Sequence, residues 1–274
     1  EILIIMFKKT AVITGGAGLL GPQHALALNE IGFNVVILDV DKKNLKIKKK
    51  FLENNKKKNT NILSYYCDIT SEKSVKNILH KLIKNQFRIE VLVNNADCNP
   101  KMTNFNNKLS GDIENYSISK LKKEINVGIV GTFICCKIFG SSMANNRSGV
   151  IINVSSELGF NAPDQRVYDP EEDVKKVKNF KPIGYSISKH AILGITRYIA
   201  TYWAHKNIRC NTLVPGAVFN NQPNFLVKNV KQRIPLARWA HKEEYKKAIQ
   251  FLATDDSSYM TGQSLIMDGG RSTW

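Results

Sequence analysis

Cysteine is scarce in this chain of 274 residues, which has five cysteines, at Cys67, Cys98, Cys135, Cys136 and Cys210. No two of them form a C-x-x-C pair, and no Cys/His cluster has the spacing of a zinc site. We therefore expect no metal centre. The odd number of cysteines and the lack of a signal peptide favour free thiols in a reducing cytoplasm.

Long apolar runs are also missing. The apolar segment at the start, Glu1 to Phe7, is far too short to span a bilayer, and we expect no membrane span elsewhere. Hydrophobic residues make up 43% of the chain and charged residues 23%, so we expect no large disordered region. The length suits one α/β domain over residues 1–274 with a large core.

Acidic residues are too few to balance the basic ones. There are 23 Asp and Glu against 40 Lys and Arg, a formal net charge of +17. Such a surplus can indicate binding to nucleic acid or to a membrane surface. Here it consists mainly of lysine, in runs such as Lys46–Lys50 and Lys56–Lys58 on predicted exposed helix faces, and no nucleic-acid motif accompanies it. We interpret it as a compositional bias and expect neither partner, although it would attract anionic small molecules.

Glycine is concentrated in one place. A buried-strand pattern at 9–14 is followed by the cluster Gly15–Gly21, a helical pattern and a second apolar strand at 34–39. This order is that of a βαβ unit that binds a dinucleotide. Gly15 permits the tight turn, a later glycine lets backbone N–H groups approach a pyrophosphate, and Gly21 lets helix and strand pack closely. The N-terminus of the helix supplies positive potential for the pyrophosphate.

Asp39, at the end of the second strand, bears on the choice of cofactor. A carboxylate there accepts hydrogen bonds from the adenosine ribose hydroxyls and repels a 2′-phosphate. The neighbouring Val40 is not basic, and we expect Lys42 and Lys43 to point outward from the next helix. We therefore predict NAD rather than NADP. The alternative is that Asp39 merely caps the helix that starts near Lys42, although Asp41 could do that instead.

Strand and helix patterns alternate along the rest of the chain. We predict strands at 62–66, 89–93, 149–154, 208–214 and 264–267, and helices at 71–82, 120–143, 185–205 and 243–252. This alternation predicts a Rossmann-type, doubly wound parallel sheet of about seven strands with helices on both faces. Ligands of such sheets bind beyond the carboxyl ends of the strands.

Tyr185 and Lys189 form a Tyr-x-x-x-Lys pattern on one of these helices. Positions i and i+4 share one face of a helix, with Cβ atoms roughly 5–6 Å apart. A nearby ammonium favours the phenolate and lowers the pKa of the phenol from about 10. The pair is a candidate device for proton transfer, although a Tyr and a Lys at this spacing also occur on many solvated helices.

Taken together, these motifs resemble those of a classical short-chain dehydrogenase/reductase over nearly the whole chain. The resemblance is carried by Thr14–Gly21, Asp68, Asn94-Asn95-Ala96, Asn126, Ser155-Ser156, Tyr185, Lys189 and Pro215-Gly216.

The resemblance implies catalytic roles for four residues. Tyr185 would be the general acid/base on the substrate oxygen, and Lys189 would lower its pKa and hold the nicotinamide ribose. Ser156 would hydrogen-bond the reacting oxygen, whereas Ser155 has the alternative role of a turn residue at the strand end. Asn126 would hold a water in a proton relay to Lys189.

The resemblance also implies a cofactor site. Asp68 would contact the adenine, and Asn94 would tie the central strands and line the cleft. The residues implied are Gly15, Gly18, Leu19, Leu20, Gly21, Asp39, Asp68, Ile69, Asn94, Asn95, Ala96, Tyr185, Lys189, Pro215, Gly216 and Val218.

Three positions depart from the family pattern. Leu19 stands where a Gly is common, with Gly18 one place early. Asp97 replaces a usual Gly, which puts an extra negative charge near the cleft or marks a different turn. Asn220 stands where many members carry a Thr that binds the nicotinamide carboxamide.

The separation of Ser156 and Tyr185 (185 − 156 = 29) exceeds the family norm. We expect the extra polar segment at about 161–182 to lie at the mouth of the site, next to a substrate lid at 217–242. A hydroxylated or phosphorylated substrate would suit the basic residues expected there, Arg166, Lys228, Lys231, Arg233 and Arg238.

These features, with the ending Met267–Trp274, resemble a narrower branch, the flagellin-modification oxidoreductases of legionaminic acid biosynthesis. We therefore predict an NAD-dependent oxidoreductase acting on a sugar or sugar phosphate of surface-glycan biosynthesis. The resemblance also implies a homo-oligomer, a tetramer or dimer. The alternatives are a 3-oxoacyl carrier-protein reductase and a non-catalytic dinucleotide sensor; the insertion itself could be a solvated loop, with its basic residues part of the lysine bias.

Overall fold

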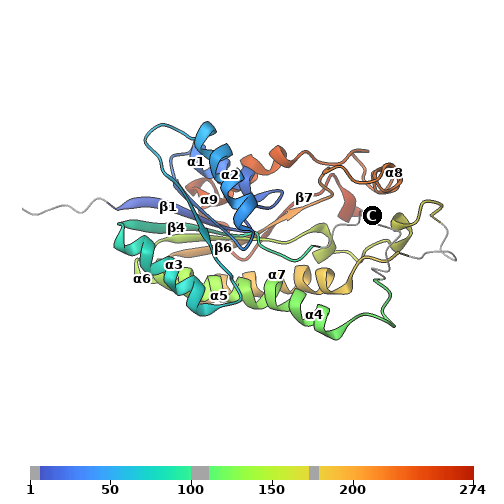
Figure 1. The fold of residues 1–274 in the computed structure, drawn as a ribbon, viewed down its shortest axis with the longest axis horizontal. Helices are drawn as coiled ribbons and strands as arrows, with labels where there is room; N and C mark the ends of the chain where they lie inside the picture. Colours follow the sequence, from blue (N-terminus) through green and yellow to red (C-terminus); the bar gives the residue numbers. More distant parts are fainter. Residues whose placement is uncertain (1–6, 100–110, 173–178) are drawn as a thin grey trace, which may run out of the picture.

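The computed structural model describes residues 7–99, 111–172 and 179–274. Its centre is a sheet of seven strands in the order β3-β2-β1-β4-β5-β6-β7, and all neighbouring strands pair in parallel (Figure 1). The strands are β1 Lys8–Thr14, β2 Asn34–Asp39, β3 Ile62–Tyr66, β4 Phe87–Asn94, β5 Gly149–Val154, β6 Ile208–Pro215 and β7 Ser264–Met267. The predicted doubly wound α/β fold is confirmed. The order reverses between β1 and β4, where such sheets bind their ligands.

Helices cover both faces of the sheet (Figure 1). On one face lie α1 Gly21–Glu30, α2 Lys42–Asn55 and α9 Lys246–Ala253. On the other lie α3 Glu72–Lys84, the run α4 Ile118–Ile125, α5 Thr132–Cys135 and α6 Ser141–Asn145, and α7 Ile183–Tyr202. The short helix α8, Asn224–Lys231, was not expected from the sequence.

The central strands are buried on both faces because helices cover both sides of the sheet and successive side chains of a strand point to opposite sides. Val12 of β1 packs into the core beneath α3 and α7, whereas its neighbours Ala11 and Ile13 pack into the core beneath α1 and α9. This arrangement explains the continuous apolar runs in the sequence. It also leaves the carboxyl ends of the strands as the place where polar side chains gather.

The helical run Ile118–Asn145 corrects the expectation that no segment could span a membrane. By length and composition it is apolar enough to do so, but 61% of its most apolar window is buried inside the fold. Cys135, Phe139 and Met143 of this run are fully buried in the core. The core helix of a soluble protein passes the same test of length and hydropathy.

The five cysteines carry free thiols, and four of them are buried. Burial raises the pKa of Cys135, Cys136 and Cys210 well above that of an exposed thiol. Within the described residues, no group of three His, Cys, Asp or Glu is placed to hold a metal ion.

His24 of α1 makes the stability of this fold depend on pH. Its ring is fully buried, and neither ring nitrogen has a hydrogen-bond partner among the described residues. Burial lowers its pKa from 6.5 to about 3. Between these values the unfolded chain binds the proton and the folded one does not, so stability falls as the pH falls.

We expect the free energy of unfolding to drop by about 2 kcal/mol more in the wild type than in His24→Leu when the pH falls from 7 to 5. Denaturant titration at both pH values would measure this difference. His80→Leu is the control, since His80 is exposed on α3. An equal drop in the wild type and His24→Leu would contradict the prediction.

Candidate active site

The glycine turn lies between β1 and α1 and is tied to the end of β4. Gly15 has φ +62°, a left-handed conformation that favours glycine. A Cβ on Gly21 would lie 2.4 Å from the carbonyl oxygen of Gly15, so only glycine fits where helix and turn meet. The Nδ2 atom of Asn95 donates hydrogen bonds to the carbonyls of Thr14 and Gly15, at 3.1 and 3.0 Å.

The turn suits a pyrophosphate. Gly18 and Leu19 are exposed, and they lead through Leu20 into the N-terminus of the ten-residue helix α1. Such a helix end offers free backbone N–H groups and positive potential to an anion. The residues present therefore fit the dinucleotide that the resemblance implies.

Asp39 lies beside this turn. Its Oδ2 atom accepts a hydrogen bond from the backbone N–H of Ala17 and its Oδ1 atom one from Asp41, both at 2.9 Å. Asp41, rather than Asp39, caps α2, by accepting the N–H of Asn44 at 2.9 Å. The capping alternative for Asp39 is thus wrong, and its half-buried carboxylate remains available to a ribose.

The other predicted cofactor residues lie at the carboxyl ends of the strands. Asp68, after β3, accepts hydrogen bonds from the N–H and hydroxyl of Thr70, and Ile69 beside it is buried. Asn94 donates to the side chain of Asn153 at 2.8 Å, which ties β4 to β5. Three more residues lie at these strand ends. The N–H of Ala96 donates to the Thr14 hydroxyl, and the N–H of Gly216 donates to the Met267 carbonyl. Val218 forms a β-bridge with Ala240.

Tyr185, Lys189 and Ser156 come together at this edge. The first two are buried on the same side of α7, with the Lys189 Nζ atom 5.5 Å from the centroid of the Tyr185 ring. Lys189 also donates to the carbonyl of Val154 at 2.9 Å. Ser156 lies close enough to Tyr185 to lower the pKa of its phenol, whereas Ser155 donates to the Lys189 carbonyl at 2.7 Å, a structural contact.

The pKa of Tyr185 differs from the simple expectation. Burial raises it, while the Lys189 ammonium acts in the predicted direction and lowers it. Asp97 then raises the pKa again. The net direction is upward, so burial outweighs the lysine in the protein alone.

Asn126 makes no side-chain hydrogen bond to Tyr185 or Lys189 within the part of the chain that the structure describes. It is exposed on the helical run, at the first position of a π-helical turn, Asn126–Gly131. The position that faces the site is Gly128, where a Cβ would lie 2.8 Å from both Asp97 Oδ1 and the Ser188 hydroxyl. The relay through Asn126, which would run through a water, stays a prediction.

Two charged side chains that sequence reasoning did not assign lie in the site. Asp97 Oδ2 is 2.9 Å from Lys189 Nζ, and both side chains are 7% exposed. Lys181 Nζ lies 4.3 Å from the centroid of the Tyr185 ring, and burial lowers its pKa to about 8. The unusual Asp97 was visible in the sequence, but nothing in the pattern singled out Lys181.

At the mouth of the site, the structure differs from the expectation that the basic side chains there face a substrate. Arg166 pairs with Asp164 at 2.8 Å, and Arg233 pairs with Asp164 at 3.1 Å and with Glu172. Arg233 of the lid thus holds the insertion, whereas Arg166 pairs within the insertion, and both guanidinium groups already have a carboxylate partner. Lys228 and Lys231 stay exposed on α8, whereas Asp173, Lys175 and Lys176 of the insertion lie outside the described residues.

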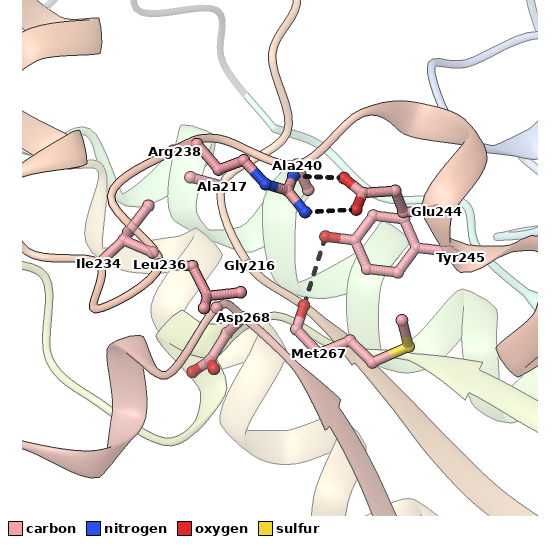
Figure 2. Close-up of a pocket in the computed structure, with 11 residues that line it drawn as sticks. Gly216, Ala217, Ile234, Leu236, Arg238, Ala240, Glu244, Tyr245, Met267 and Asp268 are labelled. Carbon is pink, nitrogen blue, oxygen red and sulfur yellow. Dashed lines mark hydrogen bonds and ion pairs between the residues drawn. The ribbon is translucent and has the colours of Figure 1, made fainter.

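The third arginine lies beside a pocket of about 190 Å³ next to Gly216. Figure 2 shows Arg238 and Glu244 facing each other, with both guanidinium–carboxylate distances at 2.7 Å. The Tyr245 hydroxyl donates to the Met267 carbonyl at 3.4 Å. The pocket is lined by Gly216, Ala217, Ile234, Leu236, Arg238, Ala240, Glu244, Tyr245, Met267, Asp268 and Gly269. Arg238 is thus also paired within the protein.

Comparison with known proteins gives consistent matches. The family model described as short chain dehydrogenase matches residues 9–168, and the one described as Enoyl-(Acyl carrier protein) reductase matches 172–272. A 3-oxoacyl-[acyl-carrier-protein] reductase of Thermotoga maritima is 30% identical over 272 residues, covering 96% of this chain and 97% of that protein.

Solved structures share the fold. An NAD⁺-bound xylitol dehydrogenase has a TM-score of 0.81 at 24% identity, covering 96% of this chain and 99% of that one. A gluconate 5-dehydrogenase from Burkholderia cenocepacia, in complex with NADP and tartrate, has a TM-score of 0.81 at 21% identity, covering 98% and 97%.

Proposed function

Because the chain belongs to the short-chain dehydrogenase/reductase family and is therefore an oxidoreductase of alcohols or carbonyl compounds, we propose that it uses NAD to oxidise a secondary alcohol, or to reduce a ketone, of a sugar or sugar phosphate in surface-glycan biosynthesis. The observation that carries the proposal is that Tyr185, Lys189 and Ser156 lie together at the carboxyl ends of the strands, the edge of the sheet that also carries the glycine turn.

The proposed chemistry follows from what these side chains can do. Bound NAD supplies the carbon that accepts or gives the hydride. Ser156 donates a hydrogen bond to the reacting substrate oxygen and polarises it. Tyr185 takes the hydroxyl proton in oxidation and returns it in reduction, and the Lys189 ammonium stabilises the phenolate in between.

For the cofactor we propose NAD, held by the exposed turn Gly18–Leu20 and by Asp39. The carboxylate lies where it would accept the adenosine ribose hydroxyls, and it would repel a 2′-phosphate. Asp68, Asn94 and Gly216 complete the proposed site from three other strand ends.

For the substrate, the paired arginines favour recognition of hydroxyl groups over recognition of a charge. The fold neighbours include dehydrogenases of xylitol and gluconate, which supports a polyol-like ligand. The second candidate is a 3-oxoacyl carrier-protein reductase, which the 30% identity to the Thermotoga maritima protein favours.

A substrate screen followed by NADH absorbance would separate the two candidates. We expect turnover with members of a panel of sugars, sugar phosphates and nucleotide sugars, and little with a 3-oxoacyl thioester. Turnover of the thioester alone, with NADPH preferred to NADH, would favour the reductase instead. No turnover of either class would contradict both candidates.

We also propose a single-domain, cytoplasmic homo-oligomer, a tetramer or dimer. Large apolar side chains are exposed along α7 and the run α4–α6, with exposed fractions of 64% for Tyr198, 57% for Tyr202 and 47% for Phe133. Exposed apolar groups on adjacent helices are typical of a covered interface. Light scattering after size exclusion would measure the mass, and a monomer at micromolar concentration would contradict this proposal.

A further inference from the structure

Three buried charges surround the phenol of Tyr185. Lys189 lies on the same helix, Asp97 comes from the end of β4, and Lys181 comes from the segment before α7. Asp97 pairs with Lys189 at 2.9 Å through Oδ2 and accepts the N–H of Cys98 at 2.7 Å through Oδ1. A buried ion pair of this kind is neutral as a unit, so Lys189 alone exerts less positive potential on the phenol.

Gly128 makes room for this arrangement. Because a Cβ there would lie 2.8 Å from Asp97 Oδ1, a side chain at this position would compete with the carboxylate for the same space. Among the described residues, the side chain that contacts the Lys189 ammonium is Asp97, and no hydrogen bond joins Lys189 to Asn126. Asp97 is thus the side chain that fixes the Lys189 ammonium beside Tyr185.

Lys181 restores the missing positive charge. Its side chain is 8% exposed, and its ammonium lies against the Tyr185 ring at 4.3 Å and donates to Asn99 Oδ1 at 2.7 Å. Across residues 7–99, 111–172 and 179–274 it has no carboxylate within ion-pair distance. Burying an ammonium without such a partner is costly, so the fold accepts a loss of stability to keep this charge beside Tyr185.

We propose that Asp97 and Lys181 belong to the proton-transfer site: Asp97 is a positioning residue that holds Lys189, and Lys181 supplies the net positive charge that favours the Tyr185 phenolate. The inference rests on the proposed role of Tyr185 as acid/base. Two ammoniums and one carboxylate leave one net positive charge beside the phenol, whereas Asp97 and Lys189 alone would leave none.

Other titratable groups face the same place and must be separated from this cluster. Glu157, one residue after Ser156, has its pKa raised to about 7 by burial, and Tyr168 of the insertion is buried near both Glu157 and Tyr185. Glu124 of α4 also acts on Lys181, but more weakly than Asp97. The test therefore measures the pKa of Lys181 directly, as well as the pH profile of the reaction.

The first measurement uses the cofactor-free protein. NMR of lysine labelled at Cε would follow the titration of Lys181, whose signal is identified by its loss in Lys181→Met. In Asp97→Asn the pKa of Lys181 should fall by about one unit or more, because the nearest counter-charge is gone and Lys189 remains. An unchanged pKa would overturn the proposal.

The second measurement is the pH profile of kcat/KM for oxidation, whose acidic limb reports the acid/base in the free enzyme. Lys181→Met should move this limb to higher pH by about one unit, and adding Asp97→Asn should move it back. An acidic limb that stays in place in Lys181→Met would contradict the charge balance. So would an acidic limb that shifts equally in Lys181→Met and in the double variant. Lys84→Met, at the exposed end of α3, is the matched control.

Failure of the proposed function has a different signature. If the protein is not the proposed oxidoreductase, none of the variants turns over substrate, yet the Lys181 titration still responds to Asp97→Asn. If the cluster is only structural, turnover persists and the limb stays in place in every folded variant.

Discussion

Tyr185→Phe is expected to lower kcat by about 10²–10⁴-fold, the range contributed by a positioned general acid/base. The substitution removes only the hydroxyl, so the ring, its burial and its contact with the Lys181 ammonium are kept. The KM for NAD should change little, because the lost atom is the one that handles the proton. Steady-state kinetics with both substrates at saturation would measure the loss.

The matched control is Tyr198→Phe, on the same helix but 64% exposed. It should retain the wild-type kcat. A Tyr185→Phe protein as active as the wild type would contradict the assignment, as would an equal loss in the control. Near-ultraviolet circular dichroism of both variants would verify that each is folded.

The parts of the site that follow from local sequence could be predicted. The turn at Gly15–Gly21 and the acid at the end of β2 sit within one βαβ unit, where spacing alone brings them together. Tyr185 and Lys189 share a face because a regular helix puts positions four apart on one side. In each case the residues that come together are separated by fewer than about 25 positions in the sequence, so local structure alone fixes the distance between them.

The rest depends on contacts that the local pattern does not contain. The run α4–α6 contains two π-helical turns, Asn126–Gly131 and Cys136–Gly140, which change the rotation of side chains along the helix and which the sequence pattern did not predict. The guanidinium of Arg233 pairs with the carboxylate of Asp164, which lies 69 positions earlier in the chain. The position of Lys181 beside Tyr185 depends on contacts far apart in the sequence, since its N–H donates to Gln165 and its ammonium donates to Asn99.

Asp39→Ser is expected to weaken NAD binding by about 10- to 100-fold, since a hydrogen bond to a charged group contributes about 1.5–3 kcal/mol. NADP binding should improve at the same time, because the carboxylate that repels a 2′-phosphate is gone. The two cofactors act as controls for each other. Asp39 also accepts the N–H of Ala17 in the glycine turn, so mere damage to the turn would weaken both. Titration of NADH and NADPH fluorescence would give both dissociation constants, and a parallel loss would show that Asp39 shapes the turn without selecting the cofactor.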